Sequence, residues 1–169
     1  GVKMADPERE VYVMVGDGSY LMMAQEIVTS IQEGYKLTIV LINNHGFSSI
    51  GGLSQSVGSG GFGTRHRFRN PETGQLDGEK LPVDFASNAR SLGAHVIEAG
   101  DLPSLHAALG EAKAQTGTTV VVIETDPEQR VPGYESWWDV PVAEVSEMKN
   151  VGEARKRYEQ AISRERHLL

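Results

Sequence analysis

Along this chain the spacing of the apolar residues changes repeatedly, and this alternation restricts the fold to a small group. Short runs rich in β-branched residues lie at 11–15, 37–42 and 118–123, and stretches with apolar residues every three or four positions lie between them. Strands that alternate with helices in this way are typical of α/β proteins with a parallel sheet. We therefore predict a Rossmann-like α/β fold, a parallel sheet flanked by helices. We expect the strands at 11–15 and 37–42 to be buried on both faces.

Cap signals place the helices of this fold. The first helix is predicted over 18–31, with Gly34 in the left-handed position just past its end. Asp84 is a suitable N-cap for the next helix, and Asp101 precedes Pro103 and a further apolar series. Asn150, which stands three residues before a glutamate, resembles a capping pair that would open the last helix.

Composition excludes several classes of function. The sequence has no run of about 18 apolar residues, so we expect no membrane-spanning segment. Sixteen basic against 23 acidic side chains give a net charge of −7, the wrong sign for a protein whose main partner is nucleic acid. Cysteine is absent, which excludes disulfides, thiolate metal sites and cysteine nucleophiles. These features favour a cytoplasmic protein.

The segment after the second predicted strand has an unusual composition. Between Gly46 and Gly63 seven glycines lie among serines, and we expect a long, mobile loop without regular structure over a functional site. Arg65, Arg67 and Arg69 follow at alternate positions and would share one face of an extended chain. They could bind an acidic product or the carboxylates of a neighbouring domain, although such a cluster is more often a solvated or interface surface.

Two short polar motifs follow the first two predicted strands. Residues 16–18 read Gly-Asp-Gly and residues 43–44 read Asn-Asn. Because ligands gather at the carboxyl ends of parallel strands, we expect the carboxylate and a carboxamide to lie close together. Each motif alone is more often a plain turn or loop, but their joint placement favours a site. Carboxylate and amide oxygens are ligands of the type that magnesium or calcium prefers.

A phosphate group is expected beside such a cation. Magnesium in proteins usually shares its coordination shell with phosphate oxygens and water. Gly18 and Ser19 open the predicted first helix, where free backbone N–H groups and the helix dipole can receive an anion. The arrangement therefore suits a metal-bridged diphosphate.

The pairing of these motifs at this spacing resembles the signature of thiamine-diphosphate-dependent enzymes, in the domain that binds the cofactor's diphosphate. Longer blocks, such as NNHGFSSIGGLSQSVGSGGFGTRHRFRN and GYESWWDVPVAEVS, resemble the branch of this family that hydrolyses a cyclic 1,2-diketone in myo-inositol catabolism. The resemblance extends from Val11 to beyond Ser146. It implies a hydrolase that acts on a carbon–carbon bond and uses thiamine diphosphate with magnesium or calcium.

The resemblance also implies roles for individual residues. Asp17 and Asn44 would bind the metal through their side chains, and Gly46 through its backbone carbonyl. The diphosphate would be lined by Gly16, Gly18 and Ser19. The catalytic residues are not identified; His45 is a candidate proton carrier, and a loop histidine bonded to backbone is the favoured alternative.

Members of this family are considerably longer and carry a pyrimidine-binding domain, usually supplied across a subunit interface. We therefore expect residues 1–169 to be the C-terminal thiamine-diphosphate-binding domain, incomplete and part of a longer homo-oligomeric enzyme, and to be inactive alone. Two alternatives stay open. One is a carboligase or decarboxylase of the acetohydroxyacid synthase type, and the other is a non-catalytic Rossmann-like module that binds a nucleotide or a protein partner.

The aromatic segment near the C-terminus breaks the strand and helix pattern. It contains Tyr134, Trp137 and Trp138. These side chains could cover the active site or bury a subunit contact, since aromatic residues are enriched at interfaces. Packing in the core is equally compatible with the sequence.

Overall fold

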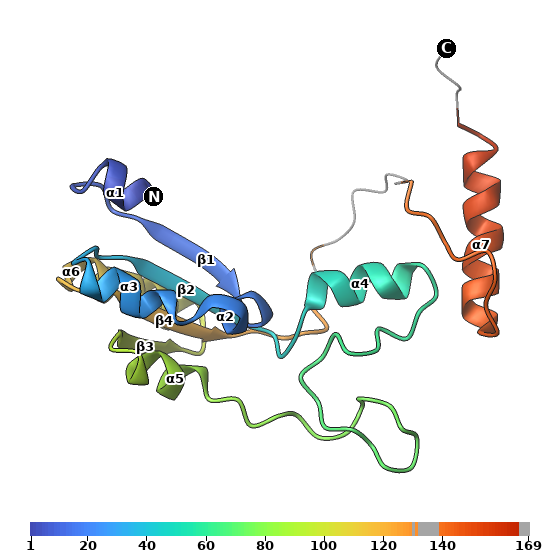
Figure 1. Cartoon of the computed structure of the whole chain (residues 1–169), viewed down its shortest axis with the longest axis horizontal. Helices are drawn as coiled ribbons and strands as arrows, with labels where there is room; N and C mark the ends of the chain where they lie inside the picture. The colour runs from blue at the N-terminus through green and yellow to red at the C-terminus, as the bar shows by residue number, and fades with distance from the viewer. Residues whose placement is uncertain (130, 132–138, 166–169) are drawn as a thin grey trace. The chain divides into compact units, whose positions relative to one another are not determined.

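The computed structural model describes residues 1–129, 131 and 139–165. Within them, four strands form a parallel sheet in the order β1-β2-β4-β3 (Figure 1). The strands are β1 Tyr12–Gly16, β2 Thr38–Asn43, β3 His95–Ala99 and β4 Thr119–Glu124. This confirms the α/β fold with a parallel sheet that the sequence predicts.

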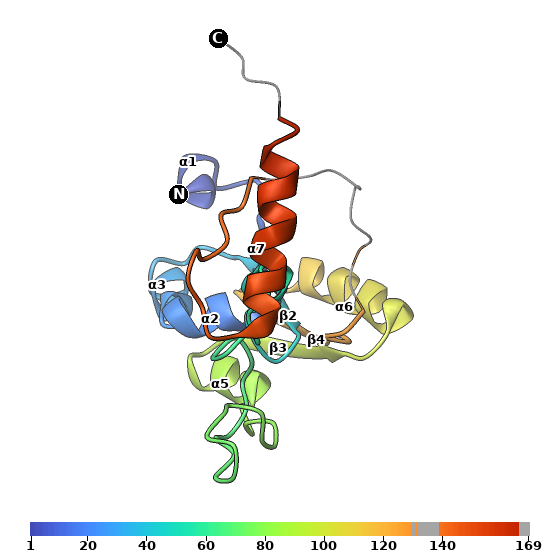
Figure 2. The same ribbon diagram turned by 90° about the vertical axis from the view of Figure 1, so that its right-hand side faces the viewer.

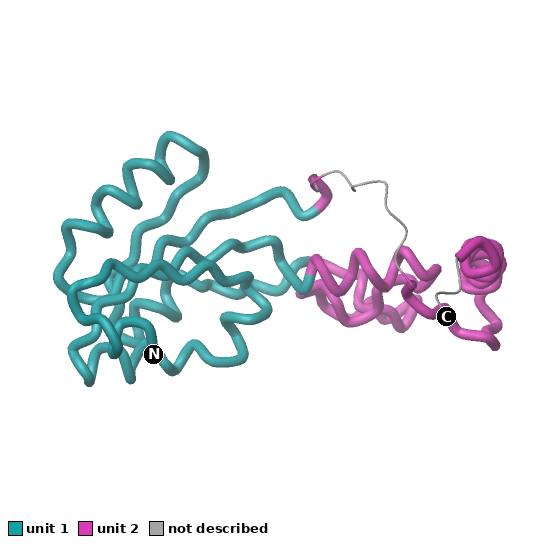
Figure 3. The backbone as a smooth tube through the Cα atoms, turned by 90° about the horizontal axis from the view of Figure 1, so that it is seen from above, with its two compact units in different colours: residues 1–47, 80–127 teal, residues 48–79, 128–169 magenta. Residues whose placement is uncertain are grey.

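The chain divides into two compact units, which Figure 3 shows in different colours. The first unit comprises Gly1–Phe47 and Lys80–Pro127 and contains the whole sheet. The second comprises Ser48–Glu79 and Glu128–Leu169.

Helices cover both faces of the sheet in the first unit. In Figure 2, α2 and α3 lie on one side of the strands and α6 lies on the other. The helices of this unit are α1 Val2–Ala5, α2 Asp17–Met23, α3 Glu26–Gln32, α5 Phe85–Ser91 and α6 Leu102–Ala114. No helix within the described ranges is long and apolar enough to cross a membrane.

The single helix predicted over 18–31 is interrupted in the structure. It ends at Met23, and α3 begins at Glu26. At this junction the N–H of Ile27 bonds to the carbonyl of Ala24, three residues back, at 3.1 Å. Bonds of this spacing are those of a 3₁₀ turn, which breaks the regular helix while the apolar period continues. Gly34 takes the left-handed conformation predicted for it, with φ of 70°.

The N-cap predicted at Asp84 is confirmed, and the structure adds one at Asp101. Asp84 accepts a hydrogen bond from the backbone N–H of Ser87 at 2.8 Å, and this bond holds the pKa of Asp84 below its ordinary value. Asp101 forms a capping box with Ser104. The hydroxyl and backbone hydrogen bonds from Ser104 likewise lower the pKa of Asp101.

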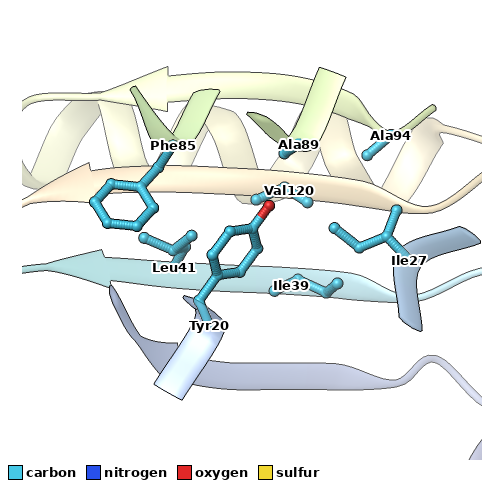
Figure 4. Close-up of a cluster of buried hydrophobic side chains, with 8 residues drawn as sticks. All are labelled: Tyr20, Ile27, Ile39, Leu41, Phe85, Ala89, Ala94 and Val120. Carbon is cyan, nitrogen blue, oxygen red and sulfur yellow. The ribbon is translucent and has the colours of Figure 1, made fainter. Parts of the chain in front are cut away.

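The main core lies between the sheet and helices α2, α3 and α5 (Figure 4). Tyr20 meets Phe85 edge to face with ring centroids 5.8 Å apart, and its hydroxyl donates to Asn88 at 2.8 Å. The members of this cluster are Tyr20, Ile27, Ile39, Leu41, Phe85, Ala89, Ala94 and Val120. On the other face, Ala108 and Ala112 of α6 pack on the sheet.

Strand β2 is buried on both faces, as predicted, but the same prediction is wrong for β1. Tyr12, Val13 and Met14 are all exposed, and Met14 keeps 74% of its surface accessible. The reason is the strand order, because β1 lies at an edge of the described sheet. Helix α6 packs on β3 and β4 and leaves the face of β1 that carries Tyr12 and Met14 uncovered within the described residues.

The prediction that the segment from Gly46 to Gly63 has no regular structure is wrong. Helix α4, Ser48–Ser56, lies inside this segment. Its Gly51 is buried, and a Cβ atom there would come within 2.8 Å of the Thr64 hydroxyl. Gly51, which in the sequence suggests a flexible loop, instead allows close packing against Thr64. The mobility of this segment over a site stays a prediction.

Helix α7, Lys149–Ile162, ends the second unit, and its predicted start is wrong. The N-cap is Met148, without a side-chain capping bond, so Asn150 lies inside the first turn. The helix is fixed instead by apolar packing of Val151 and Ala154 against Val142. The aromatic residues of segment 134–138 lie outside the described residues.

Candidate functional site

The carboxyl ends of β1 and β2 meet at one edge of the sheet. The two strands are parallel neighbours, and Gly16 is in register with Ile42. Just beyond them, the backbone N–H of Gly46 donates a hydrogen bond to Oδ2 of Asp17 at 2.7 Å. The structure thus brings together two of the residues that the sequence assigns to one site.

Asp17 is the first residue of α2 and is fully buried. Gly16 before it is extended, with φ of −77° and ψ of 156°, so the chain turns directly from strand to helix. A buried carboxylate is costly unless polar groups satisfy it, and the Gly46 N–H supplies one such group. Its place at the carboxyl end of a parallel strand makes Asp17 a candidate for ligand binding. Of the neighbouring predicted residues, Gly18 is buried and Ser19 is exposed.

Gly18 is required by close packing. A Cβ atom at this position would lie 2.6 Å from Cε1 of Phe47, where an ordinary contact is 3.4–4 Å. Phe47 directly follows Gly46 in the chain. The absence of a side chain at Gly18 therefore lets α2 and the turn after β2 approach each other closely.

The turn after β2 is fixed by its first and third residues. Asn43 accepts a hydrogen bond from the backbone N–H of His45 at 3.2 Å. His45 has φ of 58°, in the left-handed region that non-glycine residues rarely adopt. Asn44, between them, is half-buried, and Gly46 is buried.

Glu124 joins this turn and is the residue that sequence reasoning missed. Its Oε2 accepts a hydrogen bond from Nδ2 of Asn43 at 2.8 Å, and its Oε1 makes a close contact with Nε2 of His45. Glu124 is the last residue of β4, the strand next to β2. The signal that could have found it is the one used for Asp17 and Asn44, a polar residue at the end of an apolar strand.

The donor atoms at this edge suit a hard cation. The described residues contain no group of three or more His, Cys, Asp or Glu that could hold a metal ion. A cation here would therefore combine the Asp17 carboxylate with amide and carbonyl oxygens of segment 44–46. It would complete its shell with ligands from outside the chain. Oxygen donors of this kind fit magnesium or calcium.

The three alternating arginines have separate partners in the second unit. Arg65 pairs with Glu128 at 2.7 Å, and Arg67 donates to the carbonyl of Gly78 at 3.0 Å. The third, Arg69, bonds to the Gly74 carbonyl and lies over the ring of Phe62. At least two of these contacts hold the loop of residues 65–79 together.

The fold is an open parallel α/β domain, and polar residues with oxygen atoms lie at the carboxyl ends of its strands. Residues 1–123 match the family described as "Thiamine pyrophosphate enzyme, C-terminal TPP binding domain". The chain belongs to this family, which confirms the resemblance seen in the sequence.

Curated relatives have a specific name. The chain is 47% identical over 156 residues to 3D-(3,5/4)-trihydroxycyclohexane-1,2-dione hydrolase of Clostridium botulinum, with 92% of this chain and 24% of the relative covered. It is 45% identical over 163 residues to the Bacillus cereus (strain AH820) protein of that name, with 96% and 25% covered. The chain therefore spans about a quarter of the length of these relatives.

Solved structures share the fold. The benzoylformate decarboxylase of Polynucleobacter necessarius aligns with a TM-score of 0.58 at 22% identity, over 76% of this chain and 22% of that one. The 4-hydroxybenzoylformate decarboxylase of Rhodococcus jostii RHA1 aligns with a TM-score of 0.53 at 22% identity, over 73% and 21%. These likenesses show the fold alone.

Proposed function

We propose that this chain is the C-terminal, thiamine-diphosphate-binding part of a longer hydrolase. The full enzyme opens the ring of trihydroxycyclohexane-1,2-dione to 5-deoxy-glucuronic acid in myo-inositol catabolism. The observation that carries this proposal is the identity of 45–47% to hydrolases of that name over 92–96% of the chain. The decarboxylases, at 22% identity, share the fold without this agreement in sequence.

In this function Asp17, Asn44 and Gly46 hold a magnesium ion, with calcium as the alternative. The diphosphate is lined by Gly16, Gly18 and Ser19. The support is geometric and chemical: Asp17 is fully buried, its carboxylate meets the Gly46 N–H, and the available donors are hard oxygens. When bound, thiamine diphosphate supplies the nucleophilic carbon and the electron sink for carbon–carbon cleavage, while the protein binds and orients it.

The rest of the enzyme lies outside this chain in our proposal. A pyrimidine-binding domain completes the cofactor site, the subunits form a homo-oligomer, and the enzyme works in the cytoplasm on its cyclic diketone. The support is the length of the relatives, of which this chain spans about a quarter. His45 stays a candidate proton carrier, although its ring nitrogen contacts Glu124.

A substrate comparison tests this proposal. The full-length protein, supplied with thiamine diphosphate and magnesium, is assayed with the cyclic diketone and with pyruvate. We expect turnover of the diketone alone, followed as formation of the open-chain acid. Turnover of pyruvate alone would instead assign the protein to the acetohydroxyacid synthase type.

A further inference from the structure

The turn that carries Asn44 is held from a neighbouring strand by a residue that the proposed metal site does not use. Glu124 stands opposite Asn43 in the register of β2 and β4. One carboxylate oxygen accepts from Nδ2 of Asn43 at 2.8 Å, and the other contacts Nε2 of His45. A single carboxylate therefore engages the residues on both sides of Asn44.

This hold matters because the turn contains an unfavourable backbone conformation. His45 is the only non-glycine residue within the described ranges with a positive φ, at 58°. Such a conformation persists when the surrounding contacts fix it. Directly after it, the N–H of Gly46 is directed to Asp17. The orientation of Asn44 and Gly46 thus depends on His45 staying left-handed.

We propose that Glu124 is a positioning residue for the cation site. Its carboxylate fixes the turn of residues 43–46 in the conformation in which Asn44 and Gly46 can share a cation with Asp17. This inference rests on the proposed function of that edge. Glu124 acts through Asn43 and His45 and is not itself a ligand.

Position and charge make opposite predictions for two conservative variants. Glu124→Asp keeps the charge but is one methylene too short to reach both partners. Glu124→Gln loses the charge but keeps the reach, because its amide offers an oxygen that can accept from Asn43 and an NH₂ group that can face the ring nitrogen of His45. The side chain is 55% exposed, where a charge acts weakly through solvent, so position should dominate.

The experiment measures the magnesium concentration that gives half-maximal thiamine diphosphate binding by the full-length protein, using calorimetric titration. We expect Glu124→Asp and Glu124→Ala to raise this midpoint about tenfold, the usual effect of losing a residue that orients a metal ligand. Glu124→Gln should raise it much less. A wild-type midpoint in Glu124→Asp together with a raised midpoint in Glu124→Gln would overturn the proposal, since the effect would then come from charge.

A rescue variant separates positioning from general stability. Glycine adopts positive φ at little steric cost, so His45→Gly removes the need for a side-chain anchor at that residue. The double variant Glu124→Ala/His45→Gly should therefore recover several-fold in the magnesium midpoint relative to Glu124→Ala alone. No recovery would contradict a role through the conformation of residue 45.

Two further variants keep the outcomes distinct. Glu98→Ala on β3 removes a strand glutamate of similar exposure, 62%, whose partner is Arg90 at 2.8 Å, and should leave the midpoint unchanged. Equal midpoints for Glu98→Ala and all Glu124 variants would refute the inference. If instead Asp17→Ala leaves the midpoint unchanged, the proposed metal site itself fails. Thermal unfolding of each variant identifies those that fold, and Glu124→Asp and Glu124→Gln carry the test if Glu124→Ala does not.

Discussion

Replacing Gly18 by alanine should disturb the strand-end site more than the fold. The new Cβ atom would lie 2.6 Å from Cε1 and 2.7 Å from Cδ1 of Phe47, well inside the 3.4–4 Å of ordinary contact. The aromatic ring must therefore move by roughly 1 Å. Phe47 follows Gly46, whose N–H binds Asp17, so this movement reaches the atoms proposed to hold the cation.

The effect on stability is the difference between two opposing contributions. Overpacking a filled site costs about 1–3 kcal/mol. Alanine in place of glycine contributes up to about 1 kcal/mol of stability, the full value applying in a helix interior, whereas Gly18 is the second residue of α2. We therefore expect a net loss of about 0–3 kcal/mol for Gly18→Ala. Gly110, inside α6, is the matched control, because a Cβ atom there meets nothing within 4 Å.

Two measurements test this reasoning. Urea unfolding of the chain, monitored by circular dichroism, should show a gain in the free energy of unfolding for Gly110→Ala and none for Gly18→Ala. Calorimetric titration of the full-length variants should show several-fold weaker thiamine diphosphate binding for Gly18→Ala only. If Gly18→Ala gains as much stability as Gly110→Ala and binds the cofactor like wild type, the close approach of α2 to Phe47 is wrong.

Three other predictions follow from the site and the caps. Asp17→Ala and Asn44→Ala in the full-length protein should each weaken thiamine diphosphate binding about tenfold or more at limiting magnesium, and wild-type affinity in both would contradict the ligand assignment. The 169-residue chain alone should not hydrolyse the diketone, and measurable product would show that no other domain is needed. Hydrogen bonds from serine lower the pKa of Asp84 and of Asp101, so the two ionised carboxylates stabilise the folded chain above the ordinary carboxyl pKa. This stabilisation is lost as pH falls through the lowered pKa values. Asp84→Asn and Asp101→Asn should therefore reduce the loss of stability at acid pH, as measured by urea unfolding.

The features that could be predicted from sequence depend on local signals. The cap at Asp84 uses a hydrogen bond to a residue three positions away, and the left-handed Gly34 follows directly from its place after a helix. The approach of Asp17 to Gly46 could also be predicted, because consecutive strands of a parallel sheet often lie side by side. Each of these inferences needs only neighbouring residues or one general rule of topology.

The features that could not be predicted depend on contacts between distant segments. Helix α4 has a loop-like composition, and its Gly51 acquires meaning only from Thr64 packed against it. The exposure of β1 follows from its place at the edge of the sheet. A run of apolar residues predicts a strand but does not specify the order of the strands in the sheet. The 3₁₀ junction at Ala24 leaves the apolar period unchanged and is therefore invisible in it.

Strand order also explains why Glu124 escaped prediction and why it matters. In sequence, β4 is the last strand described, far from the motifs at 16–18 and 43–44. In the sheet, however, β2 lies between β1 and β4, so its following turn is reached from both sides, by Asp17 and by Glu124. A strand in this central position can have its carboxyl-end turn fixed by two neighbours at once. In our proposal this arrangement holds the turn of residues 43–46 in place for the cation, since ligands of a metal site must be positioned before the ion binds.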